Sequence, residues 1–296
     1  MKVVLLGTAA GGGFPQWNCA CALCSAARDG KLPARTPECV AVSGNSRDWW
    51  LLNASPDVRT RLNATPALSP GPRPGHSDTP VRGVLLTDAE ADHVMGLTAL
   101  RGAAGFKVYA APPVLAALSP LHAVLDRYAP WEWADSWTEG GFVLAGGLVV
   151  SAHAVGSEAP RYLAEAVGDD RWVTAYRIED LASGGVLVYA PRLGAWTPAL
   201  DDLLTGATCV LLDGTVAAAG ERDTAVRVPR GQAVRGHRPV SGADGSPSAL
   251  ARHPEARLVY THLDHTNPLL DPATDAYASV TGAGADVLPD GAEFVL

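Results

Sequence analysis

The sequence predicts a single α/β domain over residues 1–296, built on one large β-sheet or two. The chain is long enough to bury a large core, and no low-complexity linker divides it into two domains. Its 47% hydrophobic and 18% charged residues are typical of a globular protein and not of a disordered one. Short β-type runs recur from end to end whereas helical patterns are fewer, and this balance indicates the fold class.

Runs of apolar and β-branched residues bounded by turn residues predict the strands. We expect strands at Lys2–Leu6, Trp49–Asn53, Arg82–Leu86, Lys107–Ala110, Gly147–Ala154, Trp172–Arg177, Gly185–Tyr189, Cys209–Leu212 and Leu258–Thr261. Helical patterns follow Asp92-His93, cover Pro113–Arg127 and Pro198–Leu204, and begin after Asp271, where Asp-Pro supplies an N-cap and a first-turn proline. The Pro/Gly-rich stretch Leu68–Pro80 predicts a surface excursion, with a lid over a site as one use.

Charge and hydropathy argue against two classes of partner. The formal net charge is -8 and no run of Lys and Arg is present to neutralise phosphates, which argues against binding to nucleic acid. The opening MKVVLLG lacks the length and flanks of a signal peptide, and no stretch is long enough to span a bilayer. We therefore expect a soluble cytoplasmic protein with a small-molecule or short-peptide substrate and neither a nucleic-acid nor a membrane partner. The sequence leaves a homodimer open.

A glycine run, Gly11 to Gly13, follows the first expected strand and has two interpretations. A phosphate-binding loop would need a Lys-Ser/Thr pair after the glycines, and FPQW stands there instead. The favoured interpretation is a tight backbone turn near the entrance of a site, where glycine lets the main chain approach a ligand.

Three cysteines crowd into WNCACALC: Cys19, Cys21 and Cys24. One loop, about residues 14–30, can wrap three thiolates around a soft cation, so we expect a structural zinc ion. Tetrahedral zinc needs a fourth ligand, and either His262 or His265 of YTHLDHTNP could supply it from far along the chain. A redox loop of three thiols is the alternative. The isolated Cys39 and Cys209 are expected to be buried small apolar residues.

The segment GVLLTDAEADHVMGLTAL runs an apolar strand into an apolar helix through a loop of potential metal ligands. That loop carries Asp88, Glu90, Asp92 and His93. Because α/β active sites lie at the carboxyl ends of strands, these four groups predict a second, catalytic metal site. One carboxylate there would need no explanation beyond capping a helix, but three carboxylates with an imidazole exceed what capping requires.

Several motifs, in the same order over nearly the whole chain, resemble the PqqB family of pyrroloquinoline quinone biosynthesis. They are GTAAGGGFPQWNCACALC, NASPDVR, LLTDAEADHVMGL, LLDGT, GHRPVSGADGS and HTNPLL. The resemblance implies a metallo-β-lactamase-type αββα sandwich, in which Asp88 and Glu90 replace the leading histidines of a His-x-His-x-Asp-His motif. The Cys-x-Cys-x-x-Cys cluster and the late His-x-x-His are also similar to a phosphodiesterase branch of this superfamily. By that match His262 serves the catalytic metal and His265 completes the structural zinc site.

The same resemblance implies one catalytic metal ion. Hydrolases of the superfamily hold two zinc ions, and here the first ligand set is damaged, because Asp88 and Glu90 replace histidines and Pro191 stands where a bridging carboxylate would fall. The second set survives as Asp92, His93 and His262. Two imidazoles and one carboxylate form the ligand set of non-haem Fe(II) oxygenases, whereas a lone zinc ion on the same ligands would support hydrolysis. Resemblance to PqqB implies the former, a mononuclear Fe(II) hydroxylase of a tyrosine released from a precursor peptide.

Two further groups of polar residues are candidates for the site. By analogy with a related transfer-RNA-processing branch, we assign His237 as an acid/base or substrate-orienting residue and Asp213 as its partner. A surface-loop histidine and a turn-forming aspartate are the plain alternatives. Ser55, Asp57 and Arg59 of NASPDVR are expected to line or brace the site, with Arg59 as a carboxylate clamp or one half of a bracing salt bridge.

The chain departs from the PqqB pattern where substrate specificity is expected. VAAAGERDTAV follows LLDGT, and HLDHTNP stands where the family commonly has HINNTNP. Hydroxylation of another aromatic amino acid, in a related peptide-derived natural-product pathway, is therefore open as well. Two rivals remain from other classes: a metal-dependent phosphodiesterase-like hydrolase, and a non-catalytic protein that binds or carries a quinone cofactor.

Overall fold

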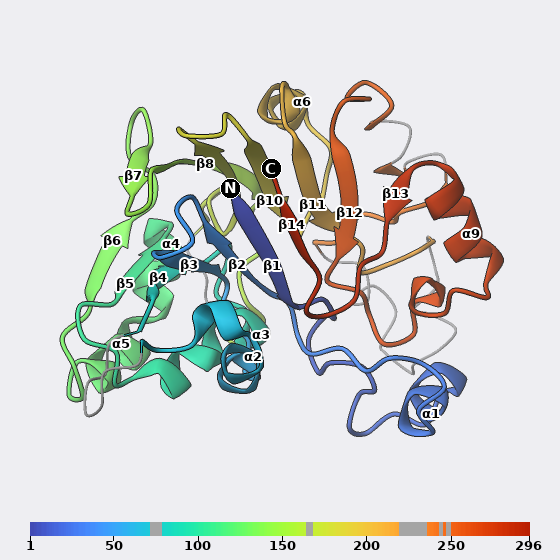
Figure 1. The fold of residues 1–296 in the computed structure, drawn as a ribbon, viewed down its shortest axis with the longest axis horizontal. Helices are drawn as coiled ribbons and strands as arrows, with labels where there is room; N and C mark the ends of the chain where they lie inside the picture. Colours follow the sequence, from blue (N-terminus) through green and yellow to red (C-terminus); the bar gives the residue numbers. More distant parts are fainter. Residues whose placement is uncertain (72–78, 164–167, 219–235, 243–244, 247–249) are drawn as a thin grey trace.

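Two seven-stranded β-sheets packed face to face form the centre of the protein (Figure 1). The structure is a computed structural model, and it describes residues 1–296 except 72–78, 164–167, 219–235, 243–244 and 247–249. The first sheet has the order β14-β1-β2-β3-β4-β5-β6, and the second has the order β13-β12-β11-β10-β9-β8-β7. In each sheet a run of parallel strands meets a run of antiparallel strands.

The strands of the first sheet are β1 (Lys2–Gly7), β2 (Cys39–Ser43), β3 (Trp49–Leu52), β4 (Val81–Leu85), β5 (Lys107–Ala110), β6 (Glu132–Asp135) and β14 (Glu293–Val295). Those of the second are β7 (Phe142–Leu144), β8 (Leu148–Gly156), β9 (Val173–Asp180), β10 (Val186–Ala190), β11 (Cys209–Asp213), β12 (Arg257–Thr261) and β13 (Ala285–Asp286).

Both faces of the sheets are buried, which explains why the strands are almost continuously apolar. On the inner face, Val3 and Leu5 of β1 belong to one apolar cluster with Tyr189 of β10. The alternate residues Val4 and Leu6 point the other way, into the cluster that the helices cover. The layers are therefore helix, sheet, sheet and helix, and the αββα sandwich that the resemblance implied is confirmed.

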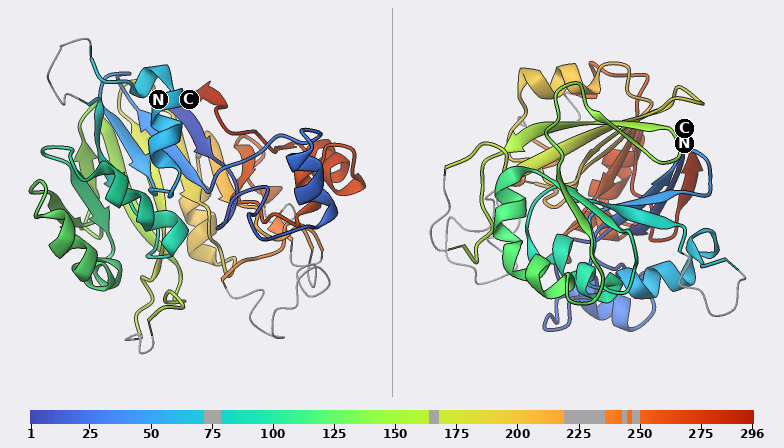
Figure 2. Two further views of the ribbon diagram at one scale, coloured as in Figure 1. Left: turned by 90° about the horizontal axis from the view of Figure 1, so that it is seen from below. Right: turned by 90° about the vertical axis from the view of Figure 1, so that its left-hand side faces the viewer.

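Helices cover the outer faces of the two sheets, as the views in Figures 1 and 2 show. The first sheet carries α2 (Val58–Ala64), α3 (Ala91–Val94), α4 (Pro112–Ala117) and α5 (Ser119–Leu125), and the second carries α6 (Pro198–Leu204) and α9 (Asp275–Gly282). Short 3-10 helices occupy Pro66–Leu68, Met95–Leu100 and Pro268–Leu270. Another helix, α1 (Ala22–Arg28), lies at one end of the molecule on the side of α9 (Figure 2). In the part of the chain that the structure describes, no helix has the length and apolarity to cross a membrane.

All of the expected strands are present, but several helices differ from the prediction. The single helix expected over Pro113–Arg127 is wrong, because the chain divides it into α4 and α5. Pro120 lies in the first turn of α5, where its missing N–H and its restriction of the preceding residue end one helix and begin another. The N-cap expected at Asp271 is also wrong, since the side chain of Thr274 accepts a hydrogen bond from the backbone N–H of Tyr277. Several elements were not predicted from the sequence, namely β2, β6, β7, β13, β14, α1 and α2.

Polar residues gather beyond the carboxyl ends of strands from both sheets. Asp88 follows β4 in the first sheet, and Arg192 and His262 follow β10 and β12 in the second. Loops at this edge form the site, as is usual for sheets with parallel strands. Of the surface excursion predicted over Leu68–Pro80, residues 72–78 lie outside the described residues, so its use as a lid stays a prediction.

Candidate metal centre and active site

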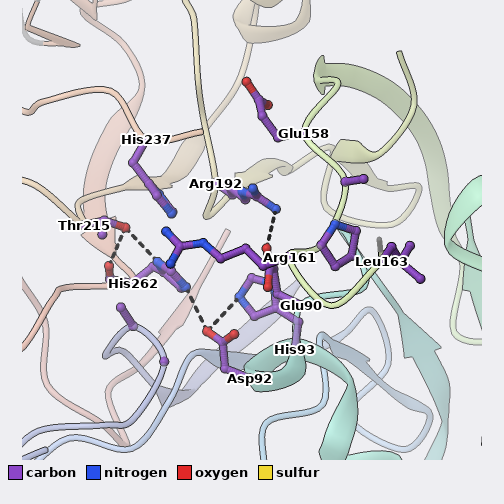
Figure 3. Close-up of a pocket in the computed structure, with 14 residues that line it drawn as sticks. Glu90, Asp92, His93, Glu158, Arg161, Leu163, Arg192, Thr215, His237 and His262 are labelled. Atoms are coloured by element: carbon purple, nitrogen blue, oxygen red, sulfur yellow. Dashed lines mark hydrogen bonds and ion pairs between the residues drawn. The ribbon is translucent and has the colours of Figure 1, made fainter. Parts of the chain in front are cut away.

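Asp92, His93 and His262 bring three potential metal ligands together at this edge (Figure 3). Their ligand atoms all lie within 4.8 Å of one another. Asp92 Oδ2 lies 3.8 Å from His93 Nε2 and 3.3 Å from His262 Nε2. The helix expected after Asp92-His93 in fact contains this pair, as α3, and a 3-10 helix follows it. The structure thus brings together the three residues that the resemblance assigned to a catalytic metal.

His93 is oriented by Asp88, which lies on the opposite side of the imidazole from the other ligands. Nδ1 of His93 is 2.9 Å from both carboxylate oxygens of Asp88. Nε2 of His93 is buried and has no hydrogen-bond partner within the described residues. Although burial lowers it, Asp88 and Asp92 raise the pKa of His93 to about 10, so this environment attracts positive charge. A histidine fixed through Nδ1 with an unpartnered Nε2 fits a metal ligand.

Thr215 fixes the second histidine in the same way. Nδ1 of His262 lies 2.7 Å from Thr215 Oγ1, which is in turn 2.6 Å from Asp213 Oδ1. Burial lowers the pKa of His262, which favours the neutral form that binds metals. Sequence reasoning missed Thr215, although the LLDGT motif contains it and its place two residues after β11 was the available signal.

The glycine run packs against the third ligand. A Cβ added to Gly11 would lie 3.1 Å from Oδ2 and 3.2 Å from Cγ of Asp92, so a larger residue would crowd this carboxylate. Gly12 and Gly13 have φ angles of 93° and 69°, which glycine adopts without strain. The turn that the sequence predicts beside a site is present.

His237 and Asp213 form the pair that the sequence analysis expected. Nδ1 of His237 is 2.8 Å from Asp213 Oδ2, and its ring stacks on His262 with the centroids 5.4 Å apart. Asp213 is buried, and although burial would raise its pKa, His237 lowers it. The pairing directs Nε2 of His237 away from Asp213, and His237 lines the cavity beside the three ligands. Its role in proton transfer stays a prediction.

A cavity of about 530 Å³ opens beside the ligands. Its wall is formed by Ala10, Gly11, Glu90, Asp92, His93, Glu158, Ala159, Pro160, Arg161, Leu163, Arg192, Thr215, His237 and His262 (Figure 3). Glu90 makes an ion pair with Arg192, at 3.4 Å from Oε1 to Nη1. Neither Glu90 nor Asp88 belongs to the group of converging ligand atoms, so the structure does not place them as ligands. Sequence reasoning missed Arg192, Arg161 and Glu158, because no local pattern indicates which loops meet.

Ser55, Asp57 and Arg59 do not line this cavity, so the expectation that they line the site is wrong, and the alternative that they brace it stays a prediction. They follow β3 and lead into α2 on the outer face of the first sheet. Ser55 is buried, Asp57 precedes α2 without a side-chain capping bond, and Arg59 is exposed. Arg192 and Arg161 are the arginines of the cavity wall, so the carboxylate clamp predicted at Arg59 is wrong for this cavity.

The three cysteines of the N-terminal loop form a second group of potential ligands. The sulfur atoms of Cys19, Cys21 and Cys24 lie within 4.8 Å of one another, at the start of α1. The main-chain oxygen of His265 is 4.0 Å from the sulfurs of both Cys21 and Cys24. The His265 ring approaches Cys19 and Asp264, which raise its pKa, but it is not part of the converging group. Its place as fourth ligand therefore stays a prediction. Cys39 and Cys209 are buried, as expected.

A buried polar network reaches His93 from the interior. Glu38 is fully buried between the sheets and accepts hydrogen bonds from the hydroxyl of Tyr189 and, at 3.2 Å, from Asn53 Nδ2. Asn53 Nδ2 is 3.1 Å from Thr87 Oγ1, which donates to Asp88 Oδ2 at 3.0 Å. Burial raises the pKa of Glu38 to about 7. The network thus continues from the core to Asp88, the carboxylate that orients His93.

Comparison with known proteins gives one consistent result. A family model described as a beta-lactamase superfamily domain matches residues 48–263. The chain is 37% identical to coenzyme PQQ synthesis protein B of Methylococcus capsulatus, over the whole of both chains. It is 38% identical to the protein of that name from Azoarcus sp., over 98% of each chain. The crystal structure of Zn(2+)-bound PqqB from Methylobacterium extorquens matches the whole chain with a TM-score of 0.90 and 35% identity. A diphosphatase of the PhnP family, at 17% identity and a TM-score of 0.69, shares the fold.

Proposed function

Because the chain belongs to the coenzyme PQQ synthesis protein B family of the metallo-β-lactamase superfamily, we propose that it is a metal-dependent enzyme of pyrroloquinoline quinone biosynthesis or of a related peptide-derived pathway. Its reaction is hydroxylation of a tyrosine-type amino acid or short peptide at a single Fe(II) ion. The observation that carries this proposal is the meeting of two imidazoles and one carboxylate at Asp92, His93 and His262, the ligand set of non-haem iron oxygenases.

A single ion is favoured because the neighbouring carboxylates are engaged elsewhere. Asp88 holds His93, and Glu90 pairs with Arg192. Asp213, His237 and His262 form a third group of close ligand atoms, but the Asp213 carboxylate already accepts from Thr215 and from the backbone N–H of Leu193. Asp92 is therefore the carboxylate of this region that is directed at both imidazole Nε2 atoms. A hydrolase with two bridged zinc ions would need a second such carboxylate.

The residues of the cavity suit an aromatic substrate. Fe(II) held by Asp92, His93 and His262 would supply the redox chemistry for inserting one atom of O₂ into a C–H bond, with two electrons from an external reductant and two protons converting the other atom to water. His237, held through Nδ1 by Asp213, presents Nε2 to the cavity and can take the phenolic proton of the substrate. Leu163, Ala159 and Pro160 supply apolar wall for the ring.

We assign a structural zinc ion to the cysteine loop. Burial raises the pKa of Cys24 to about 12, so three neighbouring thiolates would not persist at neutral pH without a cation. The main-chain bonds between Phe14 and Arg35, at 2.8 and 2.7 Å, close the loop that carries the cluster. This loop contains the region of about residues 14–30 that the sequence analysis expected to bind zinc.

Anaerobic reconstitution tests the proposed reaction. The chain is stripped of metal, reloaded with Fe(II) or Zn(II), and mixed with ascorbate, air and either L-tyrosine or short tyrosine peptides. We expect O₂ uptake and a product heavier by one oxygen atom with Fe(II) and not with Zn(II). His93→Ala should abolish both signals. His122→Ala is the matched control and should keep both O₂ uptake and product formation. His122 is half-exposed on α5 and pairs with Asp126.

Three results would contradict the proposal. Fe(II)-loaded protein that consumes no O₂ with any tyrosine-type compound excludes hydroxylation of this class. Cleavage of bis(4-nitrophenyl) phosphate by the Zn(II) or Mn(II) form would indicate the phosphodiesterase-like hydrolase instead. Tight binding of a quinone by metal-free protein, with no turnover, would indicate the carrier.

A further inference from the structure

Arg192 is a buried cation in the cavity wall whose donors are only partly used. Arg192 lies two residues after the end of β10, and 5% of its surface is exposed. Glu90 is its ion-pair partner, at 3.4 Å from Nη1. Nε and Nη1 have no hydrogen-bond partner in the described ranges of the chain. Because buried guanidinium N–H groups without acceptors are costly, we expect an acceptor that the protein does not provide.

We propose that Arg192 binds a carboxylate of the substrate; the inference rests on the proposed function, since it concerns the same cavity. A guanidinium offers five N–H donors in a planar fork that matches a carboxylate. The group is also held in place before any ligand binds. A Cβ added to Gly236 would lie 2.9 Å from both Nε and Nη2 of Arg192, so the Gly236 backbone packs against one side of the guanidinium while Glu90 lies at Nη1. A fixed donor loses little entropy on binding.

Two acidic residues near Arg192 select the kind of anion. Glu90 and Glu158 both line the cavity, and Oε2 of Glu158 is buried with no hydrogen-bond partner among the residues described. Glu158 approaches the Arg192 loop, because a Cβ added to Gly194 would lie 3.6 Å from its Oε1. These two carboxylates balance the two arginines of the wall, Arg161 and Arg192, so a zwitterion with one carboxylate and one ammonium group matches the charge of the cavity better than a phosphate dianion does. The ligand is therefore the free head group of an α-amino acid, with its carboxylate on Arg192 and its ammonium group on Glu158.

This placement orients the rest of the ligand. Figure 3 shows Glu158 and Arg192 on one side of the cavity and Asp92, His93 and His262 on the other. A head group held at Arg192 directs its side chain toward the metal ligands. The reacting atoms would then belong to the side chain and not to the amino-acid backbone.

Binding measurements on the metal-loaded full chain test the proposal without turnover. We would use Zn(II)-loaded protein under anaerobic conditions and calorimetry with L-tyrosine, tyramine, which lacks the carboxylate, and O-phosphotyrosine. Tyrosine should bind at least about tenfold more tightly than tyramine, as expected for a hydrogen-bonded charge pair. Arg192→Gln should remove this preference. Arg59→Gln, an exposed change on α2, is the matched control and should keep it.

The comparison of ligands on the unaltered chain needs no folded variant, and thermal melting reports whether Arg192→Gln folds. Equal affinities for tyrosine and tyramine, no binding of either, or tighter binding of phosphotyrosine than of tyrosine would each overturn the proposal. A carboxylate preference that persists in folded Arg192→Gln would assign the carboxylate to the metal or to another residue and would overturn it too. Oxygen uptake by the Fe(II) form is measured separately. Loss of hydroxylation with an intact carboxylate preference therefore contradicts the proposed reaction and supports the role of Arg192.

Discussion

Replacing Asp88 with Asn should weaken metal binding at the catalytic centre without changing any of its three ligands. Both carboxylate oxygens of Asp88 lie 2.9 Å from His93 Nδ1. The same oxygens accept from the backbone N–H of Glu90, at 2.9 Å, and from Thr87 Oγ1, at 3.0 Å. An asparagine has one acceptor oxygen, so its NH₂ group must face at least one of these donors. Either the imidazole loses its orientation or a buried donor loses its acceptor.

The size of the effect follows from this geometry. Removal of the partner that orients a ligating histidine lowers metal affinity by about 10- to 100-fold. That range corresponds to about 1.4 to 2.8 kcal/mol. Because Asp88 is fully buried and no water can replace the lost acceptor from bulk solvent, we expect a loss in the upper half of the range.

Competition with a chromophoric chelator, under anaerobic conditions, measures the affinity for Fe(II) and Zn(II). Asp57→Asn is the matched control, because Asp57 makes no side-chain capping bond and lies outside the cavity. The zinc ion proposed for the cysteine loop is a separate site, so the assay is run with that site filled. If Asp88→Asn bound metal as tightly as the unaltered chain, the reasoning that Asp88 holds a metal-ligating histidine would be refuted.

Three further predictions concern single residues. Cys21→Ser should lose the structural zinc and lower the melting temperature while still binding Fe(II). His93→Ala should lose Fe(II) binding and keep the structural zinc and the fold. Metal analysis and melting of both variants check this, and identical behaviour would show that the two sites are not separate. His237→Ala should keep its metal but lower kcat by about 10²- to 10⁴-fold, and an unchanged kcat would exclude acid/base catalysis by this residue. Glu38→Gln should remove a slope from the pH dependence of stability in the metal-free chain. The folded pKa of Glu38, about 7, lies above the unfolded value, so its contribution is complete below the unfolded pKa and is lost as pH rises through about 7. The loss in the free energy of unfolding is on the order of 3 kcal/mol. Stability measured against pH with the same slope in the variant and in the unaltered chain would contradict it.

The residues themselves were sufficient to predict most strands, because each is a continuous apolar run with a turn at either end. Short edge strands such as β6 and β13 carry no such run and depend on pairing with a neighbour. The cysteine cluster is local, so its spacing identified it directly. The approach of His262 to Asp92 is not local, and family resemblance was needed to expect it.

The substrate side of the site was less accessible to sequence reasoning. Arg192 and Glu158 lie on different loops, and nothing in either segment predicts that the loops meet. NASPDVR was the more attractive candidate, because it combines Ser, Asp and Arg directly after a strand. After its strand, β3, a short connection leads to α2 on the outer face, and α2 carries Arg59 away from the cavity. Chain direction after a strand, and not residue chemistry, decided which arginine reached the site.

The turn after β12 connects the two proposed metal centres. His262 has a left-handed φ of 58°, which costs about 1 to 3 kcal/mol for a residue other than glycine unless its surroundings enforce it. On one side Thr215 contacts both the ring and the main-chain oxygen of His262, at 2.7 and 2.9 Å. On the other side Leu263 bonds to Thr8 and Ala10 of the N-terminal segment, at 3.0 and 2.8 Å. The cysteine loop continues from that segment and returns to the carbonyl of the next histidine, three residues beyond His262. A zinc ion in the loop would therefore stabilise the backbone that holds His262 in its strained conformation. The N-terminal cysteine loop and the turn after β12, which are far apart in the sequence, would then support each other where they are in contact.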